Sequence, residues 1–326
     1  LAIESHRAAL AIREALLGPD HPDVATSHIN LGRALAGKGE HVSAREHFQR
    51  ALVIKEATLG ADHPDFATAT NNIGVSLMVE GQYADSLAAF ERALTLREAA
   101  FGPDHPQVAQ TLGNIGFVAN ALGQTAEAEQ ALERALELIA AAYGPEDLES
   151  IGPLNNLGLV FVSEGEDDRA LEQFRKALAI SDAHDASDSP DGAGTLLNIA
   201  DVMFERSAWT DAEQGYTRAL AALAKTPEHP WIGLAKSGLG RVALEAGDRE
   251  RARTLLDEAL EIETNTDAEP IELAKTQLGR ARLAWLQGDT AGGRALGEAA
   301  REHARAAGAV GRRWLAKIDA WLADPR

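Results

Sequence analysis

The sequence predicts an all-α protein, a solenoid of helix–turn–helix repeats closed by a C-terminal capping helix. The first observation is a repeated octapeptide: GPDHPDVA at Gly18 returns as GADHPDFA at Gly60 and GPDHPQVA at Gly102, and a diverged copy, GPEDLESI, begins at Gly144, each 42 residues after the last. The second is that apolar residues between the copies recur at helical spacing. The third is that small and bulky residues return at fixed places in each copy. Because a catalytic motif is normally needed only once, a strict period indicates architecture.

Each octapeptide is expected to separate two helices. Gly18 ends the preceding helix, since glycine accepts the left-handed conformation common just past a helix C-terminus. Pro22 fits the first turn of the next helix, where its missing N–H is not needed, and either Asp20 or His21 can cap that helix. Gly39 then divides the apolar periodicity of the unit into two helical segments.

Inside the units, a small residue of the first helix and a bulky residue of the second recur six times. The small residues are Gly32, Gly74, Gly116, Gly158, Ala200 and Gly240. The bulky residues are Phe48, Phe90, Leu132, Phe174, Tyr216 and Leu256. Small residues let two helix axes approach, and bulky side chains fill the groove between them.

The pattern L-G followed by A-x-x-x-F-x-x-A, as in Leu31-Gly32 and Ala44 to Ala51, resembles the tetratricopeptide repeat, a helix–turn–helix unit of about 34 residues. The extra residues of the present period are about two helical turns. Long repeats with G-x-D-H-P resemble those of kinesin light chain and the arrays behind bacterial serine/threonine kinase domains of the myxobacterial type. The resemblance implies a right-handed superhelix whose first helices line a concave groove that binds a peptide.

The repeats also predict the organisation of the chain. Residues 1–17 are expected to be a partial helix of a preceding repeat, so the chain is expected to be a fragment of something longer. Seven units follow, at 18–59, 60–101, 102–143, 144–185, 186–225, 226–265 and 266–308. Residues 309–326 form the cap, because one helical face carries Trp314, Leu315, Ile318, Trp321 and Leu322. We therefore expect sixteen helices, the partial first one included.

Two segments depart from the pattern. Residues 181–193, SDAHDASDSPDGA, lose the signature and predict a longer, looser loop. Gly292, Gly293 and Gly297 are expected to weaken the second helix of the seventh unit.

Composition excludes several classes of function. The 326 residues carry a formal net charge of −19, and an acidic surface repels phosphate backbones and anionic lipids, so neither nucleic acid nor a membrane is expected as partner. The absence of cysteine excludes disulfides, thiolate zinc sites and cysteine nucleophiles, and it fits a reducing, cytoplasmic compartment. No apolar run is long enough for a transmembrane helix, and no cofactor is expected.

A ladder of asparagines is the strongest indication of a binding surface. It consists of Asn30, Asn72, Asn114, Asn156 and Asn198, with Asn71 and Asn155 widening it. In tetratricopeptide arrays an asparagine at this place often holds the backbone of a bound peptide, and a carboxamide can both donate and accept. The alternative is that the ladder makes hydrogen bonds between helices and serves the scaffold.

A second row follows the small residue of each first helix: Arg33, Val75, Phe117, Leu159, Asp201 and Arg241. It is charged at its ends and apolar in the middle, which predicts a pocket around Phe117 rimmed by Arg33 and Arg241; packing against the neighbouring helix is the alternative. The predicted groove residues are therefore Asn30, Arg33, Asn71, Asn72, Asn114, Phe117, Asn155, Asn156, Asn198, Asp201 and Arg241.

Three other motifs carry no function. The loop histidines His21, His63, His105 and His229 cannot share a metal ion, because helices stack about 8–10 Å apart and zinc ligands lie about 2 Å from the ion. GRALAGKG at Gly32 and GLGRVA at Gly238 resemble nucleotide-binding loops, but no strand precedes either one.

These observations predict a non-catalytic module that binds a protein or peptide, as the recruitment region of a bacterial signalling protein such as a serine/threonine kinase. An alternative from another class is a structural or self-association element whose groove is filled by its own tail or by a second copy. An enzyme is not expected, because no constellation of reactive groups is present.

Overall fold

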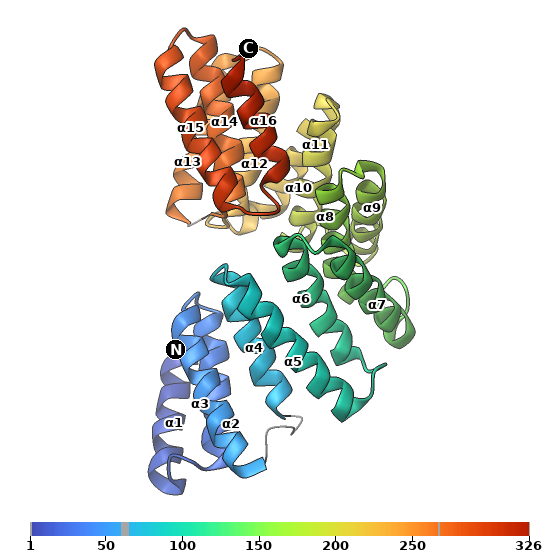
Figure 1. Cartoon of the computed structure of the whole chain (residues 1–326), viewed down its shortest axis with the longest axis vertical. Helices are drawn as coiled ribbons and strands as arrows, with labels where there is room; N and C mark the ends of the chain where they lie inside the picture. Colours follow the sequence, from blue (N-terminus) through green and yellow to red (C-terminus); the bar gives the residue numbers. More distant parts are fainter. Residues whose placement is uncertain (1, 60–64, 267, 326) are drawn as a thin grey trace. The chain divides into compact units, whose positions relative to one another are not determined.

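The computed structural model describes residues 2–59, 65–266 and 268–325. In these ranges the chain forms sixteen α-helices and two short 3₁₀ helices and has no strand, so the predicted all-α solenoid is confirmed (Figure 1). The contacts divide the chain into two compact units, unit 1 at Leu1–Pro145 and unit 2 at Glu146–Arg326.

The helices alternate in repeat order within each unit. Unit 1 contains α1 (Ala2–Leu17), α2 (Pro22–Ala36), α3 (His41–Leu59), α4 (Asp65–Val79), α5 (Tyr83–Phe101), α6 (Pro106–Leu122) and α7 (Thr125–Tyr143). Unit 2 contains η1 (Leu148–Ser150), α8 (Ile151–Glu164), α9 (Asp167–Ala183), α10 (Pro190–Glu205), α11 (Trp209–Ala222), η2 (Leu223–Lys225), α12 (Trp231–Glu245), α13 (Arg249–Asn265), α14 (Pro270–Leu286), α15 (Thr290–Ala306) and α16 (Arg312–Ala323).

The first helices of the repeats form the inner layer of each unit. In unit 1 these are α2, α4 and α6, and in unit 2 they are α8, α10, α12 and α14. Successive first helices contact each other directly, whereas contacts between successive second helices are sparser among the described residues. Closer spacing of one layer means that the stack curves toward it, so the first helices present the inner surface.

Loop histidines cap the helices that follow them. The Nδ1 atom of His21 accepts a hydrogen bond from the N–H of Asp23 at 3.1 Å, which decides between the two capping residues that the sequence left open. His105 accepts in the same way from Gln107 at 3.2 Å. In the diverged copy, Asp147 Oδ1 accepts from the N–H of Glu149 at 2.9 Å. The loop histidines therefore satisfy free backbone donors at helix starts.

Caps recur in the remaining copies and at the helix ends. His229 accepts from the N–H of Trp231 at 3.3 Å, and His63 lies outside the described residues. Gly102 ends α5 with a φ of +88°, and its N–H donates to the carbonyl of Glu98 at 2.9 Å. Glycine adopts this φ without the strain that a side chain would add.

The small residues of the first helices sit under the bulky residues of the second, as predicted. A Cβ atom on Gly158 would lie 2.3 Å from the ring of Phe174, and one on Gly32 would lie 2.6 Å from the ring of Phe48. No real Cβ fits at such distances, so these glycines set how closely each helix pair packs.

The fifth unit departs from this arrangement because Ala200 replaces the small glycine. The ring of Tyr216 instead lies against Gly238 of α12, where a Cβ would be 2.3 Å from it. Gly240 makes room for Leu256 in the same way, at 2.7 Å. The glycines of GLGRVA thus serve helix packing.

The structure narrows the predicted loop and shows that the glycine-bearing helix is formed. Residues 181–183 stay in α9 and α10 begins at Pro190, so only 184–189 form a loop, and the Ser189 side chain accepts a hydrogen bond from the N–H of Gly192 at 3.3 Å. Helix α15 is complete despite its glycines. A Cβ on Gly297 would lie 2.6 Å from the ring of Trp321, so this glycine lets α16 approach.

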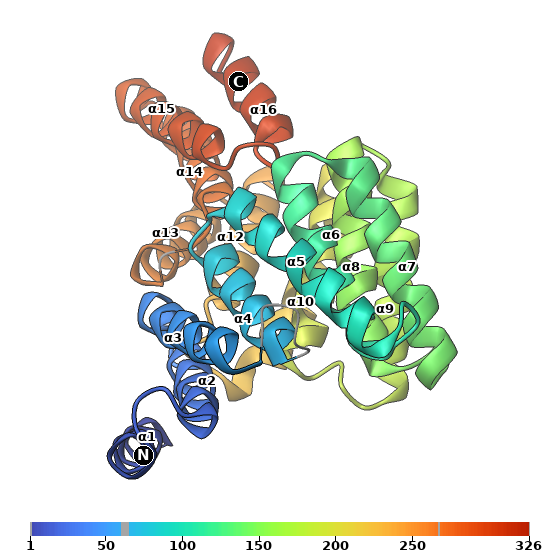
Figure 2. The ribbon, with the colours of Figure 1, turned by 60° about the horizontal axis from the view of Figure 1, so that its bottom comes forward.

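Helix α16 seals the last repeat, in agreement with the predicted cap. Its buried side chains Ile318, Trp321 and Leu322 pack on a cluster that includes Ala274 and Ala300. Figure 2 shows α16 beside α14 and α15, which it contacts.

Candidate functional site

In unit 1, the asparagine ladder leaves polar atoms without partners. Asn30 on α2, Asn72 on α4 and Asn114 on α6 are half-buried, and Asn71 is buried. The Nδ2 atom of Asn72 and the Oδ1 atom of Asn71 are buried and make no hydrogen bond. Leaving such atoms unpaired costs about 1–3 kcal/mol each. Both atoms are covered by their surroundings, so a ligand could reach this donor and this acceptor only if the carboxamides rotate, and their part in binding stays a prediction.

The second row of unit 1 contributes packing as well as surface. Phe117 is half-buried and packs against the core cluster of α5 to α7, as does Val75. Arg33 is exposed on α2. Phe117 therefore has the scaffold contact that the sequence offered as an alternative, and its part in a pocket stays a prediction.

In unit 2, one asparagine bonds between helices. Asn155 Nδ2 on α8 donates to Thr195 Oγ1 on α10 at 2.8 Å, while Asn155 Oδ1 is buried without a partner. Asn156 and Asn198 are half-buried. Asn155 therefore has the scaffold role that the sequence offered as the alternative, and its contact with a ligand stays a prediction.

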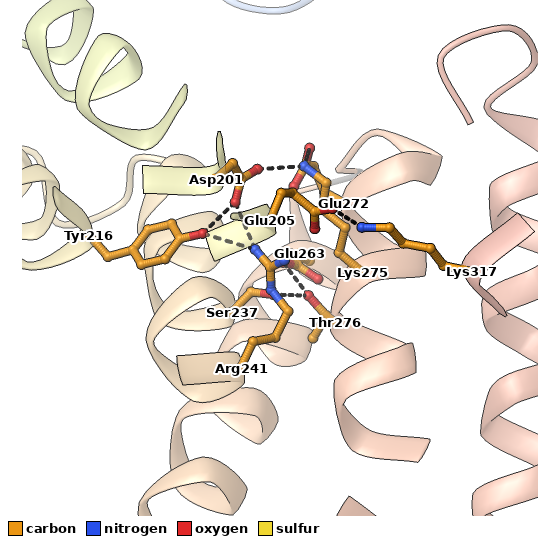
Figure 3. A network of polar contacts seen from close by, with 10 residues as sticks. All are labelled: Asp201, Glu205, Tyr216, Ser237, Arg241, Glu263, Glu272, Lys275, Thr276 and Lys317. Atoms are coloured by element: carbon orange, nitrogen blue, oxygen red, sulfur yellow. Dashed lines mark hydrogen bonds and ion pairs between the residues drawn. The ribbon is translucent and has the colours of Figure 1, made fainter. Parts of the chain in front are cut away.

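The last two predicted groove residues, Asp201 and Arg241, lie in a polar network between α10, α11, α12 and α14 (Figure 3). Asp201 Oδ1 accepts from Arg241 Nη2 at 2.8 Å and from the Tyr216 hydroxyl, and Asp201 Oδ2 accepts from Lys275 Nζ at 2.8 Å. Lys275 also donates to Glu272 at 2.9 Å. One carboxylate thereby holds three first helices together.

Opposite charges stabilise the ionised forms in this network. Burial would raise the pKa of Asp201, but the positive charges of Lys275 and Arg241 hold it below its usual range. Burial would lower the pKa of Lys275, but Asp201 and Glu272 raise it above its usual value. Removing one partner would leave a buried charge uncompensated, which is strongly destabilising.

A second carboxyl group lies behind this ion-pair cluster. Glu263 on α13 is fully buried, and its Oε1 accepts from Thr276 Oγ1 at 2.8 Å. Thr276 in turn shares a 2.6 Å hydrogen bond with Ser237 on α12. Burial raises the pKa of Glu263 to about 8, and the hydrogen bond from Thr276 opposes this shift only in part.

The N-terminal half of α16 reaches the same inner surface. The Trp314 ring centroid lies 5.5 Å from Arg241 Cζ, 5.9 Å from Lys275 Nζ and 4.8 Å from Lys317 Nζ. Arg313 Nη1 donates to Asp167 Oδ1 on α9 at 3.0 Å. Arg241 is consequently only 5% exposed, so its contact with a ligand, like that of Asp201, stays a prediction that requires α16 to move.

Glu205 on α10 joins the contact with α16. It makes ion pairs with Lys317 and with Arg313, the latter at 3.7 Å.

The sequence carries a signal for part of the polar network, because Asp201 and Arg241 occupy the same place in successive repeats with opposite charges. The contacts of Lys275, Trp314 and Lys317 had no such signal, because they depend on where α16 folds back.

The sequence signature of the tetratricopeptide repeat matches residues 1–57, 65–138, 107–183 and 193–264, which is well over half of the chain. The chain belongs to the tetratricopeptide repeat family. Proteins of this family bind protein or peptide partners. No curated protein matches this tetratricopeptide repeat chain. Among its described helices, none is long and apolar enough to cross a membrane.

Solved structures share its fold at low sequence identity. Aspartyl phosphate phosphatase F from Bacillus subtilis has a TM-score of 0.68 and 14% identity, over 89% of this chain and 73% of that one. The Rap conjugation gene regulator of plasmid pLS20, in complex with the Phr* peptide, has a TM-score of 0.65 and 18% identity, over 88% and 75%. The nearly identical repeats of a candidate kinesin light chain from Podosopora anserina have 0.52 and 20%, over 64% and 99%. The predicted likeness to kinesin light chain repeats is thus supported for the fold.

Proposed function

We propose that this chain is a non-catalytic interaction module that binds a peptide or protein segment on the inner surface of its first helices. The observation that carries the proposal is the pair of unpaired carboxamide atoms on Asn71 and Asn72. Buried polar groups in folded proteins nearly always have partners, so two neighbouring unpaired carboxamides on a first helix are candidates for pairing with a ligand or with a water molecule.

The mechanism is capture of a peptide backbone by the two carboxamides after they rotate out of their buried positions. The Asn71 Oδ1 atom would accept from a ligand N–H, and Asn72 Nδ2 would donate to a ligand carbonyl. Each such hydrogen bond is worth about 0.5–1.5 kcal/mol. Exposed Arg33 and half-buried Phe117 would add selectivity for ligand side chains.

Two further observations support a protein ligand. The pLS20 regulator, which shares the fold, is bound to a peptide. The net charge of −19 favours a basic segment. The wider setting we propose, a cytoplasmic recruitment region of a bacterial signalling protein such as a serine/threonine kinase, is supported by the resemblance of the G-x-D-H-P repeats.

The test is a peptide-display selection on the intact chain, followed by affinity measurement on variants. Asn71→Ala with Asn72→Ala should lower the affinity of selected peptides at least tenfold, about 1.4 kcal/mol. Asn265→Ala, at an exposed position near the end of α13, is the matched control and should leave affinity unchanged. Circular dichroism and thermal unfolding establish that each variant is folded.

Two results would contradict the proposal. If the folded double variant binds the selected peptides as well as the wild type, the ligand contacts another surface. If the double variant loses its helical signal, the asparagines serve the scaffold.

The second candidate, a self-association or self-occupied element, is favoured by one observation in unit 2. Helix α16 places Trp314 and Lys317 against the inner layer, and its Arg313 bonds to Asp167 at the start of α9. Light scattering over a wide range of protein concentration tests the version with two copies, and a monomer at every concentration would exclude it.

A further inference from the structure

We infer that the inner surface of unit 2 around Asp201, Arg241 and Lys275 is a receptor for a basic, tryptophan-bearing helical segment of a partner protein, and that α16 is its intramolecular occupant. The inference rests on the proposed function, because it names a ligand chemistry for the first helices of unit 2. It concerns unit 2, whereas the unpaired Asn71 and Asn72 belong to unit 1.

Helix α16 has two contact faces, which share Trp314 because its ring also packs against the apolar cluster of the last repeat. The first face caps the last repeat, because it buries Ile318, Trp321 and Leu322 in the apolar core of that repeat. Arg313 and Lys317, one turn apart, form a second edge that contacts carboxylates instead of that core. A cap needs only the first face, so the second edge requires another explanation.

The second edge complements the surface that it covers. Its two cations meet Asp167 and Glu205, whose side chains are 21% and 12% exposed. Between the cations, Trp314 presents its ring to Arg241 and Lys275. Acidic groups at the edge and buried cations in the centre thus form a pattern that a basic helix with one tryptophan matches.

The contact between α16 and the inner surface leaves some polar atoms without hydrogen bonds. Another helix could therefore take the place of α16. Arg241 is buried, yet its Nε and Nη1 atoms have no hydrogen-bond partner with α16 in place. Burial lowers the pKa of Lys317, although the Asp167 and Asp201 carboxylates act in the opposite direction. A partner helix of the same pattern with acceptors for Arg241 would therefore compete with α16.

The segment Arg313-Trp314-x-x-Lys317 defines the chemistry of the proposed partner. On a helix these three side chains lie on one side, because residues three and four apart are neighbours. The large negative charge of the chain would attract such a basic segment and reject an acidic one.

The test uses the full chain as host and a fluorescein-labelled peptide of residues 309–326 as probe. In the host, Arg313→Glu with Lys317→Glu places two carboxylates opposite Asp167 and Glu205 and should release the edge of α16. Fluorescence anisotropy should then show at least tenfold tighter probe binding than to the wild-type host. Arg312→Glu, at an exposed neighbouring position with the same change of charge, is the matched control and should bind like the wild type.

The chemistry is tested by a second probe. A peptide that carries the same two glutamates, or alanine in place of the tryptophan at 314, should not bind the released host. If the host variant does not fold, hydrogen exchange is measured on the wild-type chain instead. Added probe should then speed exchange in the first turns of α16 relative to α14.

Three outcomes would overturn the inference. Equal probe affinity for all hosts, with no change in α16 exchange, would mean that the second edge is structural. A wild-type dimer that exchanges α16 between copies would assign the surface to a second copy. If display-selected peptides still bind through Asn71 and Asn72 while the probe does not, the inference fails and the proposed function stands.

Discussion

At the scale of single residues, Glu263 makes stability depend on pH in an unusual direction. Burial raises the pKa of this carboxyl to about 8, above the value of 4.5 expected for the unfolded chain. The folded protein therefore keeps a proton that the unfolded chain releases, and the stability present below pH 4.5 is lost as the pH rises toward 8. The slope from one such group is about 1.4 kcal/mol per pH unit.

Glu263→Gln should remove this slope and raise the free energy of unfolding at neutral pH, since glutamine is uncharged and keeps the acceptor for Thr276. Urea unfolding at several pH values between 5 and 8 measures the effect. Glu261→Gln, at an exposed position of the same helix, should leave the slope unchanged. A slope that persists in Glu263→Gln would assign the pH dependence to another group.

Residue roles could be predicted from the sequence where they depend on one helix end, and not where they depend on distant helices. His21 and His105 cap the helices that begin right after them, so their surroundings are local. Arg241 was expected at the rim of an open pocket, but its surroundings include Asp201, Tyr216 and Trp314 from three other helices. The repeat period does not predict where α16 packs on the other helices of unit 2.

At the scale of a helix, the loop histidines are replaceable by another capping side chain. His105→Ala should lower the free energy of unfolding by about 1 kcal/mol, because the N–H of Gln107 loses its acceptor. His105→Asp should keep the stability, since Asp147 already caps the equivalent place and a negative charge suits a helix start. Urea unfolding compares the variants. Equal loss in both would show that stacking of His105 on Phe101, at 4.8 Å, matters more than the cap.

The packing of each helix pair depends on its small residue. Gly158→Ala places a Cβ 2.3 Å from the Phe174 ring, and such overpacking costs about 1–3 kcal/mol. The higher helix propensity of alanine offsets up to about 1 kcal/mol of this cost, so we expect a net loss of stability. Gly152→Ala in the same helix, with no atom near the added Cβ, has only the propensity term and should not destabilise. Thermal unfolding of the two variants gives the comparison, and equal midpoints would contradict the packing argument.

The positions of the helices were easier to predict than their stability and their packing against one another. Sixteen helices follow from apolar periodicity and glycine punctuation, and the residues that the structure describes form sixteen α-helices. The glycines of α15 indicated weakness by propensity alone, yet Gly297 packs against Trp321 of α16. Helix propensity is a property of single residues, so it can be read from the sequence. The packing that Gly297 allows between α15 and α16 can be judged only when the position of α16 is known.

At the scale of the whole molecule, stability should be distributed repeat by repeat. Most contacts join helices that are adjacent or next-adjacent in the chain, and the two units have separate core clusters. In such an array, stability is approximately a sum of repeat and nearest-neighbour terms. A local defect should therefore open its own neighbourhood and leave remote repeats unaffected.

Gly32→Ala and Gly240→Ala make this testable with one kind of defect in each unit. The added Cβ atoms would lie 2.6 Å from Phe48 and 2.7 Å from Leu256. Hydrogen exchange followed by mass spectrometry should show faster exchange in α2, α3 and their neighbours for Gly32→Ala, and in α12, α13 and their neighbours for Gly240→Ala. In each case the other unit should exchange as in the wild type. Equal acceleration of both units by either variant would mean that the chain unfolds as one cooperative body, because a purely local opening cannot expose amides of a unit whose core is unchanged.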